Sequence, residues 1–329
     1  MLTPSGRGSG RGFLLRGAWL LALLLLPQGL WAHETPWVRY AHIGGEPVLD
    51  VSGDGVDERT PFAVASVGKT MTAVAVLRLV ERGDLDLDDP VTTIDHDWPD
   101  LDGLDGVTIR HLLTMTSGLG EYYWPDYVED ARDDPDRVQK PEVALTYALP
   151  EAAIFAPGTD FDYSNTNYLI LGIVLETLSG DSYAEVMARE VFAPAGMLDS
   201  FVAGSRALPE GFPRGHAGRS HVRDYYAHQG FGDGGVLASA RDLVAFYDAL
   251  FGSERLLSDA MRAQMLIDPI GEDYGMGIVV SGDWVGHSGG DLGFSSDVVM
   301  DRTTGDIAVV LAGEEDADTD WAFSLLSGR

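Results

Sequence analysis

The chain has 329 residues, of which 45% are hydrophobic and 22% charged. This length and composition are enough for a buried core, and they exclude a disordered or fibrous protein. The formal net charge of −30 disfavours nucleic acid as a partner. The sequence has no cysteine, which excludes disulfides, thiolate metal sites, cysteine nucleophiles and lipoprotein acylation.

The first 32 residues differ in kind from the rest. Three arginines precede an apolar run over residues 18–26, and a cleavage site is expected after Ala32. This order is typical of a secretory signal peptide. The apolar run is about ten residues long, short of the ~20 that span a bilayer, so a membrane anchor is the less favoured alternative. We predict a signal peptide over 1–32, one secreted or periplasmic domain over 33–329, and no transmembrane segment in the mature form.

The first predicted elements of the domain are two strands, over residues 37–43 and 47–51. Apolar residues then recur at helical spacing from 71 to 82, and Gly83 follows, which predicts a helix that ends there. The next stretch, 84–105, is rich in aspartate and contains two prolines. It predicts a solvated loop, and because it lacks the spacing of a calcium-binding EF-hand it does not predict a metal site.

The middle of the chain has helical patterns and the end has strand patterns. The predicted helices cover residues 109–116, 141–148, 167–179, 183–192 and 240–251. The predicted strands cover residues 277–281, 284–287, 295–301 and 306–312, joined by turns rich in glycine or aspartate. Strands at both ends with helices between them predict an α+β fold: one antiparallel sheet built from both chain ends, with a mostly helical insertion.

The sequence Ser66-Val67-Gly68-Lys69 has the Ser-x-x-Lys spacing, which places both side chains on one face of a helix. Lys69 and Lys140 are the only lysines among 22 basic residues, so a chance match is less expected than usual. A lysine can lose its proton and act as a base, whereas an arginine effectively cannot. The alternative is a lysine that pairs with a carboxylate. We predict that Ser66 is a nucleophile activated by Lys69.

A second serine motif competes with this prediction. Residues 286–290 satisfy Gly-x-Ser-x-Gly, the nucleophile elbow of α/β-hydrolases, with Ser288 as the serine. That fold needs a histidine after the serine, but the last of the eight histidines is His287. A trypsin-like site is excluded by the helical middle of the chain. Zinc protease chemistry is excluded because His33-Glu34 lacks a second histidine at the required spacing.

A third motif, Tyr163-Ser164-Asn165, follows a turn-forming stretch. Three motifs in this order resemble those of the serine β-lactamase and penicillin-binding protein superfamily: Ser66/Lys69, Tyr163/Asn165 and His287/Gly289. The branches that they resemble are class C β-lactamases, D-alanyl-D-alanine carboxypeptidases and related esterases and D-aminopeptidases. The resemblance runs from about residue 62 to residue 312 and implies a β-lactamase/transpeptidase-like fold.

The resemblance implies a covalent mechanism. Ser66 would attack a carbonyl to give an acyl-enzyme, which water or another acceptor then resolves. Lys69 and Tyr163 would handle the protons, and the sequence leaves open which of them takes the proton from the serine. The backbone N–H groups of Ser66 and Gly290 would form the oxyanion hole. The implied catalytic residues are Ser66, Lys69 and Tyr163.

The resemblance also implies a substrate-binding set, namely Asn165, His287, Ser288, Gly289 and Gly290. Asn165 would orient the substrate amide and the lysine, and Ser288 would point its hydroxyl toward the substrate's tail. β-Lactamases usually have lysine where this chain has His287, which is charged only in part at neutral pH. This difference moves the expected substrate away from β-lactams.

One departure from the superfamily concerns the architecture. The segment between Ala32 and Ser66 is short, so we expect the outer edge of the sheet to be reduced. The loop over residues 121–140 contains Tyr122 and Tyr123 and is the expected pocket wall.

The predicted function is therefore a serine hydrolase that acts on D-amino-acid peptides, in the manner of a D,D-carboxypeptidase, or on small esters and amides. The open alternatives are a penicillin-binding or sensor protein with little turnover, and a class C-like β-lactamase. The expected partner is a small-molecule or peptide substrate, such as one derived from peptidoglycan. We expect no cofactor and no metal.

Overall fold

The computed structural model describes residues 35–134, 138, 140–218, 220–228 and 230–328. The predicted signal peptide over residues 1–32 lies outside the described residues. Among the residues that are described, no helix has the length and apolar character needed to cross a membrane.

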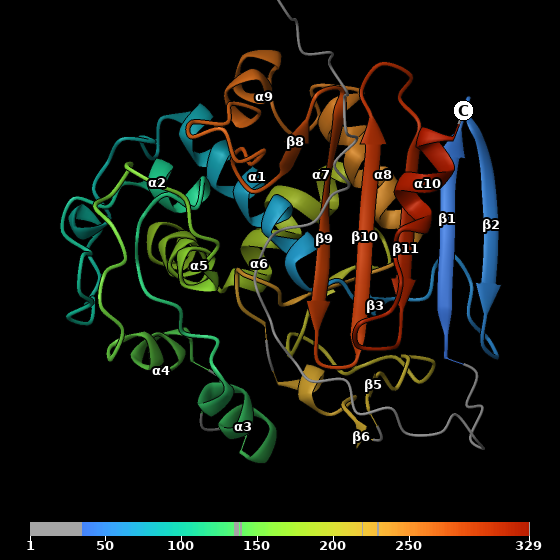
Figure 1. Ribbon diagram of the computed structural model, residues 1–329, viewed down its shortest axis with the longest axis horizontal. Coiled ribbons are helices and arrows are strands. Elements are labelled where there is room, and N and C mark those ends of the chain that lie inside the picture. Colours follow the sequence, from blue (N-terminus) through green and yellow to red (C-terminus); the bar gives the residue numbers. More distant parts are fainter. Residues whose placement is uncertain (1–34, 135–137, 139, 219, 229, 329) are drawn as a thin grey trace, which may run out of the picture. The chain divides into compact units, whose positions relative to one another are not determined.

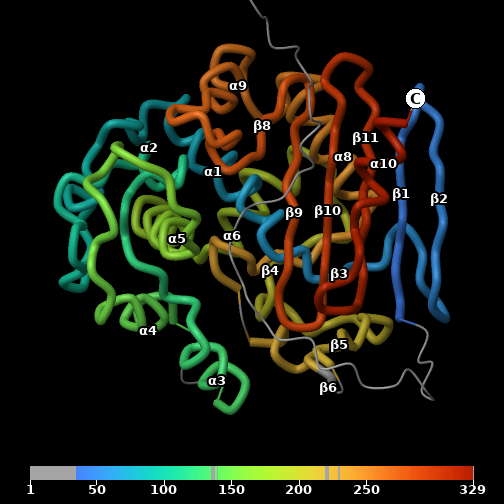
Figure 2. The backbone as a smooth tube through the Cα atoms, in the orientation of Figure 1, coloured from blue at the N-terminus to red at the C-terminus, as the bar shows by residue number. Residues whose placement is uncertain are grey.

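A six-stranded antiparallel sheet holds both ends of the domain, in the strand order β2-β1-β11-β10-β9-β8 (Figure 1). Figure 2 shows the blue N-terminal pair beside β11, in red, from the other end of the chain. The sheet confirms the architecture expected from the sequence. Its strands are β1 (Trp37–Ile43), β2 (Glu46–Ser52), β8 (Val279–Ser281), β9 (Trp284–Asp291), β10 (Phe294–Asp301) and β11 (Ile307–Ala312).

The outer hairpin corrects one expectation, because the edge of the sheet is not reduced. Strands β1 and β2 pair along their full length, from Trp37 opposite Ser52 to Ile43 opposite Glu46. The turn between them is Gly44-Gly45, with φ of 58° and 85°. Two consecutive residues with positive φ make the tightest hairpin connection, and glycine adopts these angles without steric cost. A short segment before Ser66 is therefore long enough for both strands.

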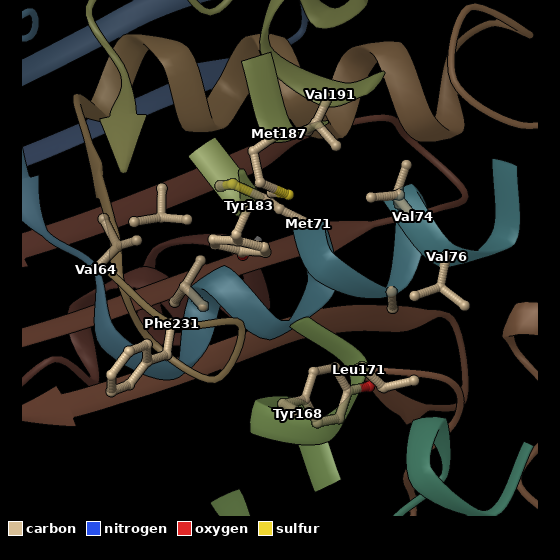
Figure 3. Packing of buried hydrophobic residues seen from close by; sticks show 14 of the residues in the cluster. Val64, Met71, Val74, Val76, Tyr168, Leu171, Tyr183, Met187, Val191 and Phe231 are labelled. Carbon is tan, nitrogen blue, oxygen red and sulfur yellow. The ribbon is translucent and has the colours of Figure 1, made fainter. Parts of the chain in front are cut away.

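Helix α1 (Gly68–Arg82) is the centre of the core, and most of its residues are buried. It packs against α5 (Asn165–Ser179), against α6 (Tyr183–Met187) and against the π-helical turn that continues α6 over Ala188–Phe192. Figure 3 shows buried side chains from these elements, among them Met71 of α1 and Met187 of α6. The helix begins three residues before the predicted start, at Gly68 rather than Met71, and its first turn is buried like most of the rest.

Helices cover both faces of the sheet. Helix α8 (Ala240–Phe251) packs on β11 and β1 on the face that joins the main core. Helix α10 (Trp321–Ser327) packs on the opposite face, where Ala322 and Leu326 contact Val299 and Val310. Successive side chains of a strand point to opposite faces of the sheet, so the same strands contribute apolar side chains to the layer on each face.

The remaining helices are α2 (Ile109–Leu113), α3 (Pro125–Asp133), α4 (Pro141–Leu145), α7 (Ala193–Ala195) and α9 (Asp259–Met265). Helix α2 ends before the predicted residue 116, since Met115 has a φ of 59°, outside the helical range. Helix α3 lies in the segment expected to be a loop. Pro125 occupies its first turn together with Asp126, and both residue types favour a helix start.

Short strands complete the architecture. A three-stranded sheet has the order β3-β7-β4, from β3 (Phe62–Ala63), β7 (Val236–Ala238) and β4 (Phe201–Val202). A separate pair is formed by β5 (His216–Ala217) and β6 (Ser220–His221). Because β3 leads directly into the turn that contains Ser66, its pairing with β7 fixes where that turn begins.

Candidate active site

Ser66 lies in a 3₁₀ turn, Ala65–Val67, directly before α1. Its neighbour Ala65 has a φ of 45°, in the left-handed region that non-glycine residues rarely adopt. Such an angle costs of order 1–3 kcal/mol and persists only where the surrounding structure enforces it. The turn therefore holds Ser66 in one defined, half-buried position at the start of the buried helix.

Lys69 is fully buried, and its Nζ has three hydrogen-bond acceptors. Nζ donates to Oγ of Ser66 at 2.9 Å, to Oδ1 of Asn165 at 2.7 Å and to the backbone oxygen of Asp233 at 2.6 Å. None of the three is a carboxylate, which does not fit a lysine kept for an ion pair. A neutral amine has two N–H groups and one lone pair. If Asn165 and Asp233 accept the two N–H groups, the lone pair points at Ser66.

Tyr163 lies on the loop directly before α5, beside Lys69. The centroid of its ring is 5.1 Å from Nζ of Lys69. Its hydroxyl is buried and has no hydrogen-bond partner among the described residues. A buried hydroxyl without a partner costs about 1–3 kcal/mol. Such a group, beside Lys69, is a candidate for interaction with a ligand.

His287 on β9 is 3% exposed, so it lies behind the site rather than in its opening. Its Nδ1 is 2.6 Å from the backbone oxygen of Ser288, which only accepts, so Nδ1 carries the proton. Nε2 then accepts from the hydroxyl of Tyr274 at 3.1 Å. Burial is the main cause that lowers the pKa of His287 to about 4, against the hydrogen bond to the backbone oxygen of Ser288, which raises it. The expectation of a partial charge at neutral pH was wrong: the ring is neutral.

Gly289 brings β9 against the turn that contains Ser66. A Cβ at this position would lie 2.4 Å from the backbone oxygen of Val64 and 3.0 Å from the backbone nitrogen of Ser66. Ser296 of β10 anchors the same turn, since its Oγ donates to the oxygen of Val64 at 2.8 Å. Only glycine permits this approach of strand to turn.

Ser288 and Gly290 alternate with His287 and Gly289 along β9, so they belong to the opposite face of the strand. Both are exposed, and a Cβ at Gly290 would meet nothing within 4 Å. The structure thus brings Lys69 and Gly289 against Ser66, and Asn165 against Lys69. It does not bring the hydroxyl of Ser288 to that side.

Three acidic residues around the site have no role predicted from the sequence: Glu121, Asp233 and Asp291. Burial raises the pKa of each carboxyl group. Oδ2 of Asp233 accepts from the hydroxyl of Tyr122 at 2.8 Å. The chain has 52 acidic residues, and composition alone does not distinguish these three. The role of Asp233 was also hidden because its backbone oxygen, not its side chain, contacts Lys69.

Tyr123 connects the loop after α2 to the tip of the β9–β10 hairpin. Its hydroxyl donates to Oδ1 of Asp291 at 2.5 Å, and the same oxygen accepts the backbone N–H of Leu292 at 2.7 Å. Asp291 directly follows Gly290. The aromatic segment expected to be a pocket wall is therefore tied to the strand beside the candidate site, although Tyr122 itself is buried in the core.

This chain is similar in sequence to known proteins. Penicillin-binding protein 4* of Bacillus subtilis (strain 168) is 30% identical over 296 residues, which cover 80% of this chain and 63% of that protein. Esterase EstB of Burkholderia gladioli is 40% identical over 173 residues, or 49% of this chain and 43% of the esterase. This chain thus spans less than two thirds of the length of these relatives.

The fold is also that of solved structures. A D-stereospecific amidohydrolase from Streptomyces sp. superimposes with a TM-score of 0.72 at 25% identity, covering 88% of this chain and 92% of that one. The profile of the family described as Beta-lactamase matches residues 40–323, a range that includes Ser66, Lys69 and the His287/Gly289 motif on β9. The chain therefore belongs to the beta-lactamase family.

Proposed function

We propose that this protein is a serine hydrolase that forms an acyl-enzyme on Ser66 and cleaves amides or peptides of D-amino acids, or small esters. The contact that carries the proposal is that of Lys69 with Ser66, 2.9 Å from Nζ to Oγ. The other two acceptors of Nζ, on Asn165 and Asp233, hold the amine in place beside the hydroxyl of Ser66. The similarity to an esterase and to a D-stereospecific amidohydrolase supports the same reaction type.

In the proposed acylation, Oγ of Ser66 attacks the substrate carbonyl while its proton passes to the neutral amine of Lys69. The backbone N–H groups of Ser66 and Gly290 would stabilise the negative oxygen that forms. The unpartnered hydroxyl of Tyr163 would donate its proton to the leaving group, and the proton on Lys69 would restore it. Hydrolysis then runs the same transfers in reverse, with water in place of the leaving group.

The charges around Ser66 favour some substrates over others. His287 is neutral, so the His287/Gly289 motif offers no cation to a substrate carboxylate. Acidic side chains, Glu121 and Asp233, lie near Lys69. These features favour substrates without a carboxylate beside the scissile bond, such as D-amino-acid amides and small esters. They disfavour β-lactams and peptides that end in D-Ala-D-Ala.

We propose export of the protein with cleavage after Ala32. The support is the order of arginines, apolar run and small residues in the first 32 positions. Expression in a bacterial host, followed by mass spectrometry of the extracytoplasmic fraction, tests this. A mature chain that begins at His33 is expected, and full-length protein confined to the cytoplasm would rule it out.

Four substrates test the proposed reaction: p-nitrophenyl acetate, D-alanine p-nitroanilide, a D-Ala-D-Ala peptide and a chromogenic cephalosporin. We expect wild-type turnover of the first two, slower or no turnover of the last two, and no turnover of any by Ser66→Ala. Fluorescent penicillin with mass spectrometry identifies the acylated residue. Turnover of no substrate, together with no adduct on Ser66, would overturn the proposal. A stable penicillin adduct without turnover of any substrate would instead identify a penicillin-binding sensor.

A further inference from the structure

The carboxylate of Glu121 lies beside the candidate site, although no sequence motif includes it. Its two oxygens accept four N–H groups. Oε1 accepts from the backbone nitrogens of Tyr122 and Tyr123, each at 2.7 Å. Oε2 accepts from the backbone nitrogen of Asn165 at 2.8 Å and from its side-chain Nδ2 at 3.1 Å. A carboxylate accepts but does not donate, so every donor that faces it is fixed in direction.

Asn165 consequently has a single favourable orientation. Its Nδ2 donates to Glu121, and its Oδ1 accepts from Nζ of Lys69. If the amide were turned over, Nδ2 would face the N–H groups of Lys69 and Oδ1 would face the carboxylate. Both new contacts would be repulsive, because donor would meet donor and acceptor would meet acceptor.

Glu121 also caps the helix that carries Asn165. Ser164 precedes α5 but makes no capping hydrogen bond with its side chain. The first backbone N–H of α5, that of Asn165, is instead satisfied by Glu121. A negative charge at a helix N-terminus is favourable, since the exposed N–H groups make that end positive. Both the backbone and the side chain of Asn165 are thus held by one carboxylate.

We propose that Glu121 is a positioning residue for the reaction: through Asn165 it keeps the amine of Lys69 aligned with the hydroxyl of Ser66. The inference rests on the proposed function and extends it by one residue. The chain of contacts runs from carboxylate to amide, from amide to amine and from amine to hydroxyl. Glu121 acts through Asn165 and does not itself bind the substrate.

Glu121→Gln tests this role, because glutamine keeps the size but turns one acceptor into a donor. We expect kcat to fall roughly 10- to 100-fold, the cost of a small misalignment of reacting groups, with KM changed less than about twofold. The loss should be equal on p-nitrophenyl acetate, which has no amine, and on D-alanine p-nitroanilide, which has one. Glu151→Gln is the matched control. Glu151 packs against Gly120, the residue directly before Glu121, and we expect wild-type kinetics for this variant.

A double-mutant cycle tests whether the effect passes through Asn165. In an Asn165→Ala background, Glu121→Gln should change kcat by less than about twofold, since the group through which Glu121 acts is gone. The full loss in that background would overturn the inference. Wild-type kcat for Glu121→Gln would also overturn it. A higher KM for the nitroanilide alone, with kcat unchanged, would overturn it too, because Glu121 would then bind the substrate amine.

Two further measurements keep the outcome unambiguous. If Glu121→Gln does not fold, Glu121→Asp replaces it: the shorter carboxylate cannot reach all four donors, so we expect kcat to fall several-fold. Wild-type kcat for Glu121→Asp would overturn the inference. Ser66→Ala distinguishes the two proposals. If wild type and Ser66→Ala are equally inactive, the proposed function has failed, whereas an active wild type with no Glu121 effect contradicts only the positioning role.

Discussion

Nζ of Lys69 donates to Oδ1 of Asn165 at 2.7 Å, although the two residues are 96 positions apart in the sequence. The bond joins the first turn of α1 to the first residue of α5. Together with the backbone oxygen of Asp233, it leaves one direction of the lysine nitrogen for Ser66. The site is thus a property of two helices and a loop, and it can be tested residue by residue.

Replacing Lys69 should remove the base. We expect Lys69→Met and Lys69→Arg to lower the rate of Ser66 acylation by about 10²- to 10⁴-fold, since neither side chain can take the proton. The burst of p-nitrophenolate from p-nitrophenyl acetate measures this rate. Lys140→Met removes the other lysine, which is exposed, and should leave the burst unchanged. Normal acylation by Lys69→Met would show that Lys69 is not the base.

Tyr163→Phe should separate catalysis from stability. The variant loses a hydroxyl that has no partner among the described residues, so we expect the free energy of unfolding to stay level or rise by up to about 1–3 kcal/mol. Amide hydrolysis should fall by about 10²- to 10⁴-fold, because an amine leaves only when protonated. The p-nitrophenyl ester, whose leaving group needs no proton, should lose less. An equal loss on both substrates would argue against a general acid.

The buried His287 should make stability depend on pH. Its folded pKa is about 4, below the ordinary value of 6.5, so the unfolded chain binds the proton first as pH falls. The neutral ring of His287 therefore contributes about 3 kcal/mol to the free energy of unfolding above pH 6.5, and this contribution is lost as the pH falls from 6.5 to 4. Urea unfolding of wild type and His287→Asn measures it as the difference between the two proteins, which cancels other titrating groups. A difference that is constant with pH would contradict the lowered pKa.

The two glycines of β9 should respond differently to the same substitution. Gly289→Ala forces a Cβ to within 2.4 Å of the backbone oxygen of Val64. The strand must move away from the turn that contains Ser66, and we expect kcat/KM to fall about 10²-fold. Gly290→Ala meets nothing within 4 Å and should stay within about threefold of wild type. Steady-state kinetics of both variants test this, and equal effects would contradict it.

The bond between Tyr123 and Asp291 should support both stability and activity. Tyr123→Phe leaves a buried carboxyl group short of one donor, so we expect a loss of about 1–3 kcal/mol in urea unfolding. KM should rise several-fold, since the loop beside Gly290 loses its tie to the hairpin. Tyr147→Phe is the control. Tyr147 donates to Asp130 at 2.5 Å, a bond of the same kind that does not involve the β9–β10 hairpin. An unchanged KM for Tyr123→Phe would show that the tie is structural only.

Local patterns in the sequence were sufficient for most of the fold. The predicted strand Trp37–Ile43 and the predicted helix Ala240–Phe251 have the observed bounds, since each repeats apolar residues at the period of its element. Helix α3 was missed because its pattern is weakly apolar, and only its first-turn proline marks it. The outer edge of the sheet was expected to be reduced, and this was wrong because the two-residue turn Gly44-Gly45 leaves enough residues for two full strands.

The sequence by itself was enough to predict Ser66 as the nucleophile and Lys69 as its partner, because their spacing on a helix is local and lysine is otherwise almost absent. Only the tertiary structure decided the surroundings. The charge state of His287 depends on burial between distant elements, and the acceptor on Asp233 is a backbone atom that no motif encodes. Glu121 is one acid among 52, and its contact with Asn165 exists only in the folded chain.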